Sequence, residues 1–347
     1  MRTTHTAMKK SDKMNFPTYL IFSLITIGVM LLCICVGSVS VPLKDTFTVL
    51  AQAITGQKGE GLTWSIIIIR RLPRVLCVAL TGTALSLSGA AMQGLLKNPL
   101  ADGSTLGVSS GASLGAVIAI AFGITFPGLP FAGTMVMAVI FAFISLLIIL
   151  GLAYKLDCSL STNTIILIGV IFSMFVSSGM SIIITFAADK IQGITFWTMG
   201  SLANSSYVNA AILAGALVIF GGIIFGNATE LNAFAIGEDN ARHIGVNVRR
   251  TKLLVLICVA VLLGVCVSVG GTIGFVGLVT PHMVRMIVGP NHKKLLPASA
   301  FGGAVFLLLA DLVARILLNP MELPIGVVTS LVGAVVFVFI FYKTRRR

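Results

Sequence analysis

Residues 70–112, RRLPRVLCVALTGTALSLSGAAMQGLLKNPLADGSTLGVSSGA, join a membrane-spanning run to features that a simple membrane anchor does not require. Small residues recur every four positions along the run, at Gly82, Ser86, Ala90 and Gly94. This spacing places them on one helix face, where small side chains let two helix backbones pack closely in lipid. A polar break at 97–102 separates the run from a second small-residue series, Gly107, Gly111 and Gly115. The stretch therefore predicts two closely packed membrane helices joined by a polar turn.

The composition makes a lipid bilayer the solvent of the whole chain. Of 347 residues, 57% are hydrophobic and 10% are charged, and the mean hydropathy is +1.05. A soluble globule cannot bury that much apolar surface, and a membrane-spanning helix needs about 20 apolar residues. Suitable runs lie near 20–41, 72–95, 105–125, 131–154, 162–187, 207–228, 251–271, 273–289, 298–318 and 324–342. We predict an all-α polytopic membrane protein of about ten transmembrane helices, with a single membrane domain over residues 1–347.

The basic residues predict the orientation of these helices. An even number of spans puts both termini on one side, and the alternate loops and tails that share this side hold seventeen of the 24 lysines and arginines. Lysine and arginine accumulate in cytoplasmic loops, so we expect both termini, including a tail over 1–19, to be cytoplasmic. The location expected is the bacterial cytoplasmic membrane. The net charge of +13 then reflects topology and contact with membrane lipids, and we expect no nucleic-acid partner.

No group of residues suggests catalysis, a cofactor or a disulfide framework. The six cysteines lie mostly in apolar runs, where cysteine acts as a small hydrophobic residue. Three histidines, His243, His282 and His292, are scattered and have no acidic residue at ligand spacing, so we expect no metal site. The phosphate-binding pattern G-x-x-x-x-G-K-[ST] is absent from the sequence. This chain is therefore not expected to be an enzyme or to hydrolyse ATP.

The longest polar stretch within the body of the chain is ELNAFAIGEDNARHIGVNVRRTK, residues 230–252. It is too polar to cross lipid. Gly237 followed by Glu238 and Asp239 predicts a turn into a short helix that has acidic residues at its positive end, and Gly245 is a typical helix stop. We predict a two-helix cytoplasmic elbow over 230–252.

Hydroxyl side chains follow one face of the fifth run. Gly169, Ser173, Ser177, Ser181 and Thr185 repeat every four residues and so form a single stripe. The stripe has two readings. It could be a close helix contact whose hydroxyls bond back to their own carbonyl groups, or it could be a polar strip that lines a path through the membrane.

Three motifs carry a resemblance to a known family. The opening block 70–112, the segment GGTIGFVGLVTPHMVRMIVGPNHKKLLP and the closing segment MELPIGVVTSLVGAVVFVFIFYK resemble the FecCD-type permeases. These are the membrane subunits of ABC importers for iron-siderophores, haem and cobalamin. The family usually has proline where this chain has Thr272, and a further proline within its counterpart of 333–337. These departures concern local helix geometry and not the class of protein.

The resemblance implies the function and the partners of the chain. It implies the fold of a type II ABC importer permease, like that of the cobalamin permeases. Two copies, or this chain and a homologous permease, would enclose the path, and two cytoplasmic ATPase subunits would drive transport. An extracytoplasmic binding protein would deliver a chelated iron complex such as a siderophore, or haem or cobalamin.

The resemblance also assigns roles to individual residues. Contact with the ATPase is implied for Gly237, Glu238, Asp239, Ala241, Arg242, Ile244 and Gly245. Docking of the binding protein is implied for Arg71, Arg74 and Arg315. The fifth helix is central in the family, which favours a pathway role for Ser173, Ser177 and Ser181. Helix packing is expected for Gly107, Gly111 and Gly115.

Two other functions compete with this reading. An ion-coupled secondary transporter would need charged coupling sites in mid-membrane, and Asp311 is the only plausible proton carrier. Asp311 and Arg315 stand four residues apart, however, and this spacing predicts an internal ion pair on one helix face. A structural scaffold or lipid-binding anchor would leave the polar elbow without a role.

Overall fold

The computed structural model of the protein describes residues 14–57, 59–126, 132–158 and 161–345. Within these residues every named element is a helix, and Leu318 and Met321 form an isolated bridge. The predicted all-α fold class is therefore confirmed. The α-helices are α1 Phe16–Cys35, α2 Leu43–Ile54, α3 Leu62–Trp64, α4 Leu72–Leu95, α5 Val108–Ala121, α6 Ala132–Leu156, α7 Thr162–Phe186, α8 Ile191–Thr198, α9 Tyr207–Ala216, α10 Gly222–Gly226, α11 Ala228–Ile236, α12 Glu238–His243, α13 Val248–Gly270, α14 Val276–Val288, α15 His292–Ile316 and α16 Ile325–Arg345.

Length and composition divide the helices of the described chain into two groups. Seven helical segments are long and apolar enough to cross a bilayer. Three shorter apolar helices, at Val108–Ala121, Val276–Val288 and Ile325–Phe339, bring the number of apolar helices to ten. This agrees with the predicted polytopic architecture of about ten spans.

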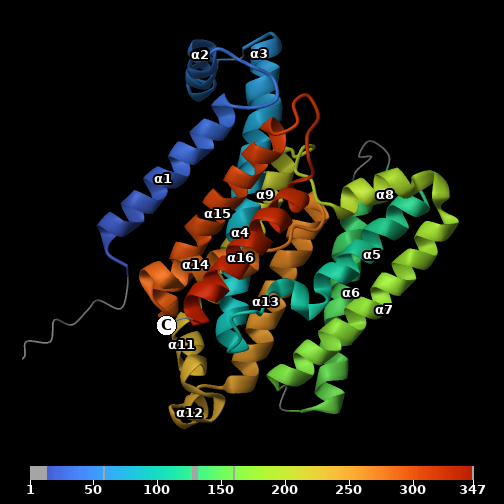
Figure 1. Ribbon diagram of the computed structural model, residues 1–347, viewed down its shortest axis with the longest axis vertical. Coiled ribbons are helices and arrows are strands. Elements are labelled where there is room, and N and C mark those ends of the chain that lie inside the picture. The colour runs from blue at the N-terminus through green and yellow to red at the C-terminus, as the bar shows by residue number, and fades with distance from the viewer. Residues whose placement is uncertain (1–13, 58, 127–131, 159–160, 346–347) are drawn as a thin grey trace, which may run out of the picture.

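The helix α4 runs through the centre of the bundle, and its small residues set how closely its neighbours approach (Figure 1). A Cβ atom on Gly82 would lie 2.3 Å from the carbonyl oxygen of Gly303 in α15, and a Cβ atom on Gly303 would lie 2.2 Å from the carbonyl oxygen of Gly82. On another face of α4, a Cβ atom on Gly89 would lie 1.9 Å from the carbonyl oxygen of Gly277 in α14. These distances leave no room for any side chain, so α4, α14 and α15 pack with their backbones in contact.

The helices α5, α6 and α7 form a second group beside this core (Figure 1). A Cβ atom on Gly111 would lie 1.7 Å from Oγ of Ser145 in α6, and one on Gly115 would lie 2.3 Å from the carbonyl oxygen of Met137. Gly107 precedes α5 with a left-handed φ of 75°. Gly111 and Gly115 thus lie on the α5 face that packs against α6, whereas Gly107 lies beside both α6 and α7.

Two helix boundaries differ from the sequence-based expectation. The first span lies at Phe16–Cys35 and not at 20–41, so the helix begins inside the tail expected over 1–19. The second span begins at Leu62, well before Pro73, because a π-helical turn at Ser65–Arg71 joins α3 to α4. Proline has no N–H for the ladder, and a π-turn is one way for a helix to continue past such a gap. The α4 helix itself begins at Leu72 and has Pro73 in its first turn, which agrees with the predicted run 72–95.

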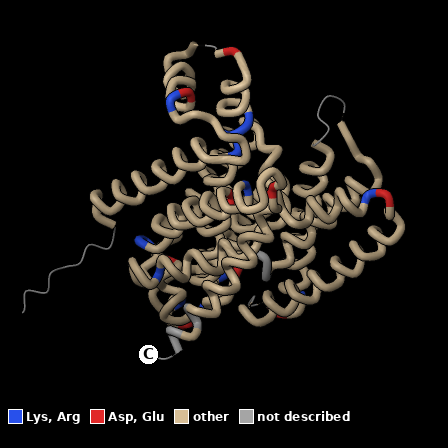
Figure 2. The backbone as a smooth tube through the Cα atoms, turned by 45° about the horizontal axis from the view of Figure 1, so that its top comes forward, with Lys and Arg blue, Asp and Glu red and all other residues tan. Residues whose placement is uncertain are grey.

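The bundle has two ends with different structures. The helices α2 and α3 lie at one end, and α11 and α12 lie at the opposite end (Figure 1). The C-terminal end of α16 lies toward α11, and α1 begins in that half of the molecule and runs up toward α2. Figure 2 shows that charged residues gather near the ends of the helices, while long stretches between them are uncharged. We call the α11 and α12 side the elbow end and the α2 and α3 side the arginine end.

Candidate functional site

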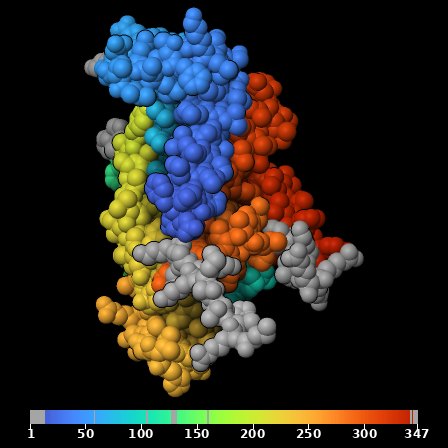
Figure 3. Space-filling view, turned by 90° about the vertical axis from the view of Figure 1, so that its left-hand side faces the viewer, coloured from blue at the N-terminus to red at the C-terminus, as the bar shows by residue number. Residues whose placement is uncertain are grey.

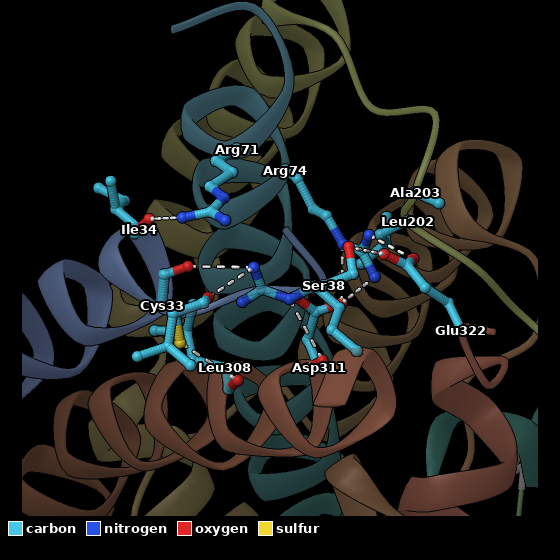
Figure 4. A network of polar contacts seen from close by, with 12 residues as sticks. Cys33, Ile34, Ser38, Arg71, Arg74, Leu202, Ala203, Leu308, Asp311 and Glu322 are labelled. Atoms are coloured by element: carbon cyan, nitrogen blue, oxygen red, sulfur yellow. Dashed lines mark hydrogen bonds and ion pairs between the residues drawn. The ribbon is translucent and has the colours of Figure 1, made fainter. Parts of the chain in front are cut away.

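A buried network of charged residues joins three helices at the arginine end (Figure 4). Arg74 of α4 donates from Nη2 and Nε to Oδ1 of Asp311, at 2.9 and 3.0 Å. Its Nη1 donates to Oε2 of Glu322 at 2.7 Å. On the other side of Asp311, Oδ2 lies 3.0 Å from Nε of Arg315. Asp311 thus lies between two guanidinium groups, and the predicted ion pair with Arg315 on one face of α15 is confirmed.

Arg315 and a further arginine, Arg71, bind carbonyl groups at the end of the first helix, α1. Arg71 donates to the carbonyl oxygens of Ile34 and Cys35, at 2.7 and 3.0 Å. Arg315 donates from Nη1 to the carbonyl oxygen of Cys33 at 3.0 Å. The last carbonyl groups of a helix have no partner within the helix, and they carry its partial negative charge. Arg71 and Arg315 therefore cap α1, which otherwise lies along the outside of the bundle (Figure 3).

These contacts bear on the expected docking role of the arginines. The structure brings Arg71, Arg74 and Arg315 together, yet they are only 6%, 8% and 2% exposed, and each already has partners in its own chain. A cavity of about 190 Å³ opens beside them, and Arg70 and Glu322 lie at its wall. A partner would reach the three guanidinium groups through this cavity, or would displace the Glu322 carboxylate. Binding-protein docking by these residues stays a prediction.

Sequence reasoning missed the contacts that Arg74 makes. Its two carboxylate partners are 237 and 248 residues away in the chain. A signal was present, because an acidic residue inside a membrane span needs a cationic partner. The three guanidinium groups of Arg71, Arg74 and Arg315 still exceed the two carboxylates of Asp311 and Glu322 by one positive charge.

At the opposite end, the polar stretch forms two short helices, α11 and α12, joined at Gly237 (Figure 1). Gly237 has a φ of 133°, which side-chain-bearing residues rarely adopt, so glycine is needed for this turn. Ala241 of α12 is buried, while Ile244 at its end is 67% exposed. The chain turns again at Gly245, which has a φ of 90°, before α13 begins. The elbow thus exposes two apolar side chains, Ile236 at the end of α11 and Ile244 after α12.

Ion pairs tie α12 to the following helix and stabilise its own surface. Lys252 of α13 is fully buried, and its Nζ lies 2.7 Å from Oε1 of Glu238 in the first turn of α12. On the exposed side of α12, Arg242 lies 3.5 Å from Asp239. The buried pair fixes the position of α12 relative to α13, whereas an exposed pair contributes little.

A second contact ties α11 to α15. The side chain of Asn232 donates to Oδ1 of Asn291 at 2.9 Å, and it accepts the backbone N–H of His292 at 2.7 Å. These groups lie at the start of α15, whose other end carries Asp311 and Arg315. The two ends of the bundle are therefore joined by one continuous helix.

The hydroxyl stripe of α7 lies on a surface of the chain. Ser173 donates to the carbonyl oxygen of Gly169 at 2.8 Å, and Ser181 donates to that of Ser177 at 3.0 Å. Ser177 and Ser181 are exposed. The hydroxyls thus bond back to their own helix, as in the first reading of the stripe. Because Ser177 and Ser181 make no close helix contact within this chain, a pathway role stays a prediction.

A cavity of about 320 Å³ lies between α5, α7 and α14. Asp102 and Ser109 line it from the α5 side, Met180 lines it from α7, and Gly277 lines it from α14. The carboxylate of Asp102 lies against the first turn of α14, where a Cβ atom on Gly277 would be 2.4 Å from Oδ1. A negative charge is favourable at the positive end of a helix. The cavity has a mixed lining of polar and apolar residues, and it is small compared with a metal chelate or a corrinoid.

Comparison with known proteins places this architecture in a family. The profile of the FecCD transport family matches residues 24–343. The chain is 39% identical over 350 residues to an uncharacterized ABC transporter permease protein, YvrB, of Bacillus subtilis (strain 168), covering 100% of this chain and 99% of that protein. It is 37% identical to the hemin transport system permease protein HmuU of Yersinia pestis (82% and 85% covered) and 35% identical to the vitamin B12 import system permease protein BtuC of Shigella boydii serotype 18 (98% and 99% covered).

The fold agrees with a solved relative. A structure described as an inward-facing conformation of a metal-chelate type ABC transporter superposes with a TM-score of 0.83 and 30% identity, over 94% of this chain and 99% of that chain. The ten apolar helices and these relatives identify a multi-pass protein of the inner membrane. The chain belongs to the FecCD transport family, whose members are membrane permease subunits of ABC importers and not enzymes themselves.

Proposed function

We propose that this chain is the transmembrane permease subunit of an ATP-driven importer that carries a chelated iron complex (a siderophore), or haem or cobalamin, across the cytoplasmic membrane. The observation that carries the proposal is the family match over residues 24–343, together with relatives named for hemin and vitamin B12. The cavity of about 320 Å³ beside Asp102 is too small for a metal chelate, haem or cobalamin. The ligand would therefore travel between subunits and not through a single chain.

The partners follow from the surfaces of the chain. The exposed hydroxyl face of α7 provides a polar surface for the wall of a path, and a second copy of this chain, or a homologous permease, would supply the opposite wall. The sequence lacks a phosphate-binding loop, so ATP hydrolysis belongs to separate cytoplasmic subunits. An extracytoplasmic binding protein would deliver the ligand to the arginine end.

The elbow is the proposed contact with the ATPase. It projects from the elbow end and carries the exposed Ile244 at the end of α12. It is also tied to two membrane helices, by Glu238 to α13 and by Asn232 to α15. A displacement of the elbow would therefore be transmitted to both helices.

The arginine end is the proposed contact with the binding protein. Arginine forms paired hydrogen bonds with carboxylates, and the network holds one more positive than negative charge. A carboxylate of the binding protein would offset this charge. Because the three arginines are buried, their role would be to hold the docking surface and to present its charge through the cavity beside Arg70.

Transport in vesicles tests this function and separates it from the ion-coupled alternative. We would reconstitute the chain with the ATPase and binding protein encoded beside it, and measure uptake of a labelled ferric siderophore, haem or cobalamin. Vanadate-sensitive uptake of one ligand that requires internal ATP is expected. Uptake by the chain alone, driven by an ion gradient and insensitive to vanadate, would establish the secondary transporter instead.

Cysteine labelling tests the orientation. In a variant without the six native cysteines, single cysteines replace Thr4, Gln57 and Thr344. Because most basic residues are expected inside, a membrane-impermeant maleimide added to intact cells should label only position 57. Labelling of either terminal position from outside would reverse the proposed orientation.

Changing Glu238 tests the tie between α12 and α13. In Glu238→Gln the buried ammonium of Lys252 loses the carboxylate 2.7 Å away, and we expect a loss of about 2 kcal/mol in unfolding free energy, because Glu238 is itself only partly buried. ATP-driven uptake should fall further than ATPase binding. Both are measured on the purified complex, by uptake in vesicles and by co-purification.

Two further variants test an exposed charge and the turn geometry of the elbow separately. Arg242→Gln breaks only the exposed pair with Asp239 and should leave the free energy of unfolding nearly unchanged. Gly237→Trp imposes a side chain on a left-handed turn and should weaken co-purification of the ATPase. Wild-type uptake and co-purification in both Glu238→Gln and Gly237→Trp would move the ATPase contact away from the elbow.

A further inference from the structure

An open groove lies on the outside of the bundle near the elbow end. It has a volume of about 560 Å³ and runs between the π-helical turn Leu217–Gly221 with α10 on one side and the first turns of α13 on the other. Phe220 and Ile223 form one wall, and Leu254 and Ile257 form the other. The groove therefore offers an apolar surface to the bilayer along the length of two helical turns.

The helix that carries Phe220 and Ile223 is irregular and rich in glycine beside the groove. A π-helical turn holds one more residue per turn than an α-helix does, so it shifts the side chains that follow it. Gly222 and Gly226 come next, and a Cβ atom at either position would meet nothing within 4 Å. These two exposed glycines add no side chain to the outer surface beside Phe220 and Ile223.

The mouth of the groove carries positive charge. Arg249 and Arg250 lie in the first turn of α13, next to Asn247, and both are exposed. The guanidinium of Arg249 lies 4.8 Å from the ring centroid of Tyr154 in α6. Among the described residues neither arginine has a carboxylate partner, and no acidic residue lines the groove. The start of α13 adds the positive end of a helix dipole.

This arrangement differs from ordinary placement of arginine at a membrane surface. An arginine that only extends toward water needs no cavity beside it. Here two arginines without a carboxylate partner among the described residues stand at one end of an apolar groove, and the groove leads from a helix start into the hydrocarbon region. A phospholipid has the complementary arrangement, because its phosphate would meet the arginines and its acyl chain would lie along the apolar groove.

We propose that this groove binds one anionic phospholipid, with its phosphodiester at Arg249 and Arg250 and an acyl chain along Phe220, Ile223, Leu254 and Ile257. Charge complementarity selects the occupant, because basic pockets between membrane helices bind anionic headgroups. The bound lipid fixes the start of α13 and so the helix on which Lys252 holds α12. The lipid site itself does not depend on the proposed transport function.

Native mass spectrometry of the isolated chain tests the proposal. The protein is purified without any partner, mixed with vesicles of phosphatidylglycerol and phosphatidylcholine in equal amounts, and extracted in mild detergent. We expect retention of one phosphatidylglycerol in preference to phosphatidylcholine. A basic residue near a lipid surface contributes ~1 kcal/mol, so Arg250→Gln should lower this preference about fivefold, and Arg249→Gln with Arg250→Gln should remove most of it.

Three comparisons keep the result interpretable. Arg242→Gln removes one exposed positive charge from the neighbouring elbow and should leave the preference unchanged. Arg250→Lys keeps a charge and should retain most of it. Leu254→Trp fills the apolar wall and should lower retention of both lipids at this site.

Several outcomes would overturn the proposal. Equal retention of the two lipids by the wild-type chain would mean that only ordinary boundary lipid is present. An equal effect of Arg242→Gln would mean that net charge and not the groove sets the preference. If the chain alone shows no preference and Arg250 is protected only when the ATPase is added, the mouth of the groove binds an acidic protein surface instead.

Discussion

Replacing Gly89 with leucine should abolish recovery of the folded protein. A Cβ atom at this position would lie 1.9 Å from the carbonyl oxygen of Gly277 and 2.6 Å from its Cα, so the clash is with backbone and not with a movable side chain. Overpacking of a core typically costs about 1–3 kcal/mol, and we expect more here because α4 and α14 cannot separate without opening the centre of the bundle. Size-exclusion chromatography of a fluorescent fusion in detergent measures the yield of folded protein.

A series of glycine variants gives this prediction its controls. Gly28→Leu places the same side chain on α1, where nothing lies within 4 Å, and should be recovered normally. A Cβ atom at Gly111 would lie 1.7 Å from Oγ and 2.5 Å from Cβ of Ser145 in α6, but its nearest backbone atom is 3.0 Å away, so the yield of Gly111→Leu should lie between those of the other two. A monodisperse Gly89→Leu protein with the thermal stability of Gly28→Leu would show that the contact between α4 and α14 is looser than described.

The sequence predicted the membrane helices but only one of the close contacts of α4. A spacing of four marks a single helix face, and Gly82 and Ser86 do lie where α15 packs. Gly89 belongs to another face and stood outside that pattern. Because α4 is buried on nearly all sides, no single stripe of small residues describes its packing.

Local spacing also limited what could be predicted of the charged network. Asp311 and Arg315 were recognised as a pair because they are one helical turn apart. The contact between Arg74 and Asp311 depends on how α4 and α15 cross, and the caps that Arg71 and Arg315 place on α1 depend on which helix ends meet. Sequence patterns within one helix contain neither kind of information. The three arginines, to which the resemblance assigns a docking role, are found buried.

Helix starts were predicted well where a cap or a glycine marks them, and poorly where a turn continues the helix. In the elbow the predicted glycine positions agree with the structure, because α12 begins after Gly237 and the chain turns at Gly245. Pro73 does lie in the first turn of α4, but the helical segment begins earlier, at Leu62. The π-turn that precedes α4 is a geometry for which the surrounding residues give no distinctive pattern.

Asp311→Ala should cause the largest loss of stability among single changes in the charged network. Asp311 is fully buried between Arg74 and Arg315, and its removal leaves two buried guanidinium groups without the carboxylate they share. Removing one partner of a buried ion pair typically costs about 3–5 kcal/mol, because the remaining charge is not compensated. The loss should appear in the midpoint of thermal unfolding, measured in detergent, and in the yield of purified protein.

Two related variants test whether this effect comes from the buried charge balance. Glu322→Gln removes the carboxylate that is 30% exposed and should cost much less, because water can replace part of its interaction with Arg74. Asp311→Ala combined with Arg315→Met removes one charge of each sign and should recover part of the lost stability, although Cys33 then loses its cap. Equal losses in Asp311→Ala and Glu322→Gln would contradict the arrangement in which Asp311 is the central acceptor.

The same residue separates the two transport mechanisms. If Asp311 carried a proton, Asp311→Asn would keep the fold and uncouple uptake from a pH gradient, because the amide has the shape of the carboxyl group but cannot titrate. In the network described here both oxygens of Asp311 face guanidinium groups, and an amide presents one N–H₂ group to a cation. Asp311→Asn should therefore lower stability by several kilocalories per mole, about as for other broken buried pairs, and reduce ATP-driven uptake whether or not a pH gradient is present. A stable Asp311→Asn protein with normal ATP-driven uptake and an altered response to pH would instead assign proton coupling to this residue.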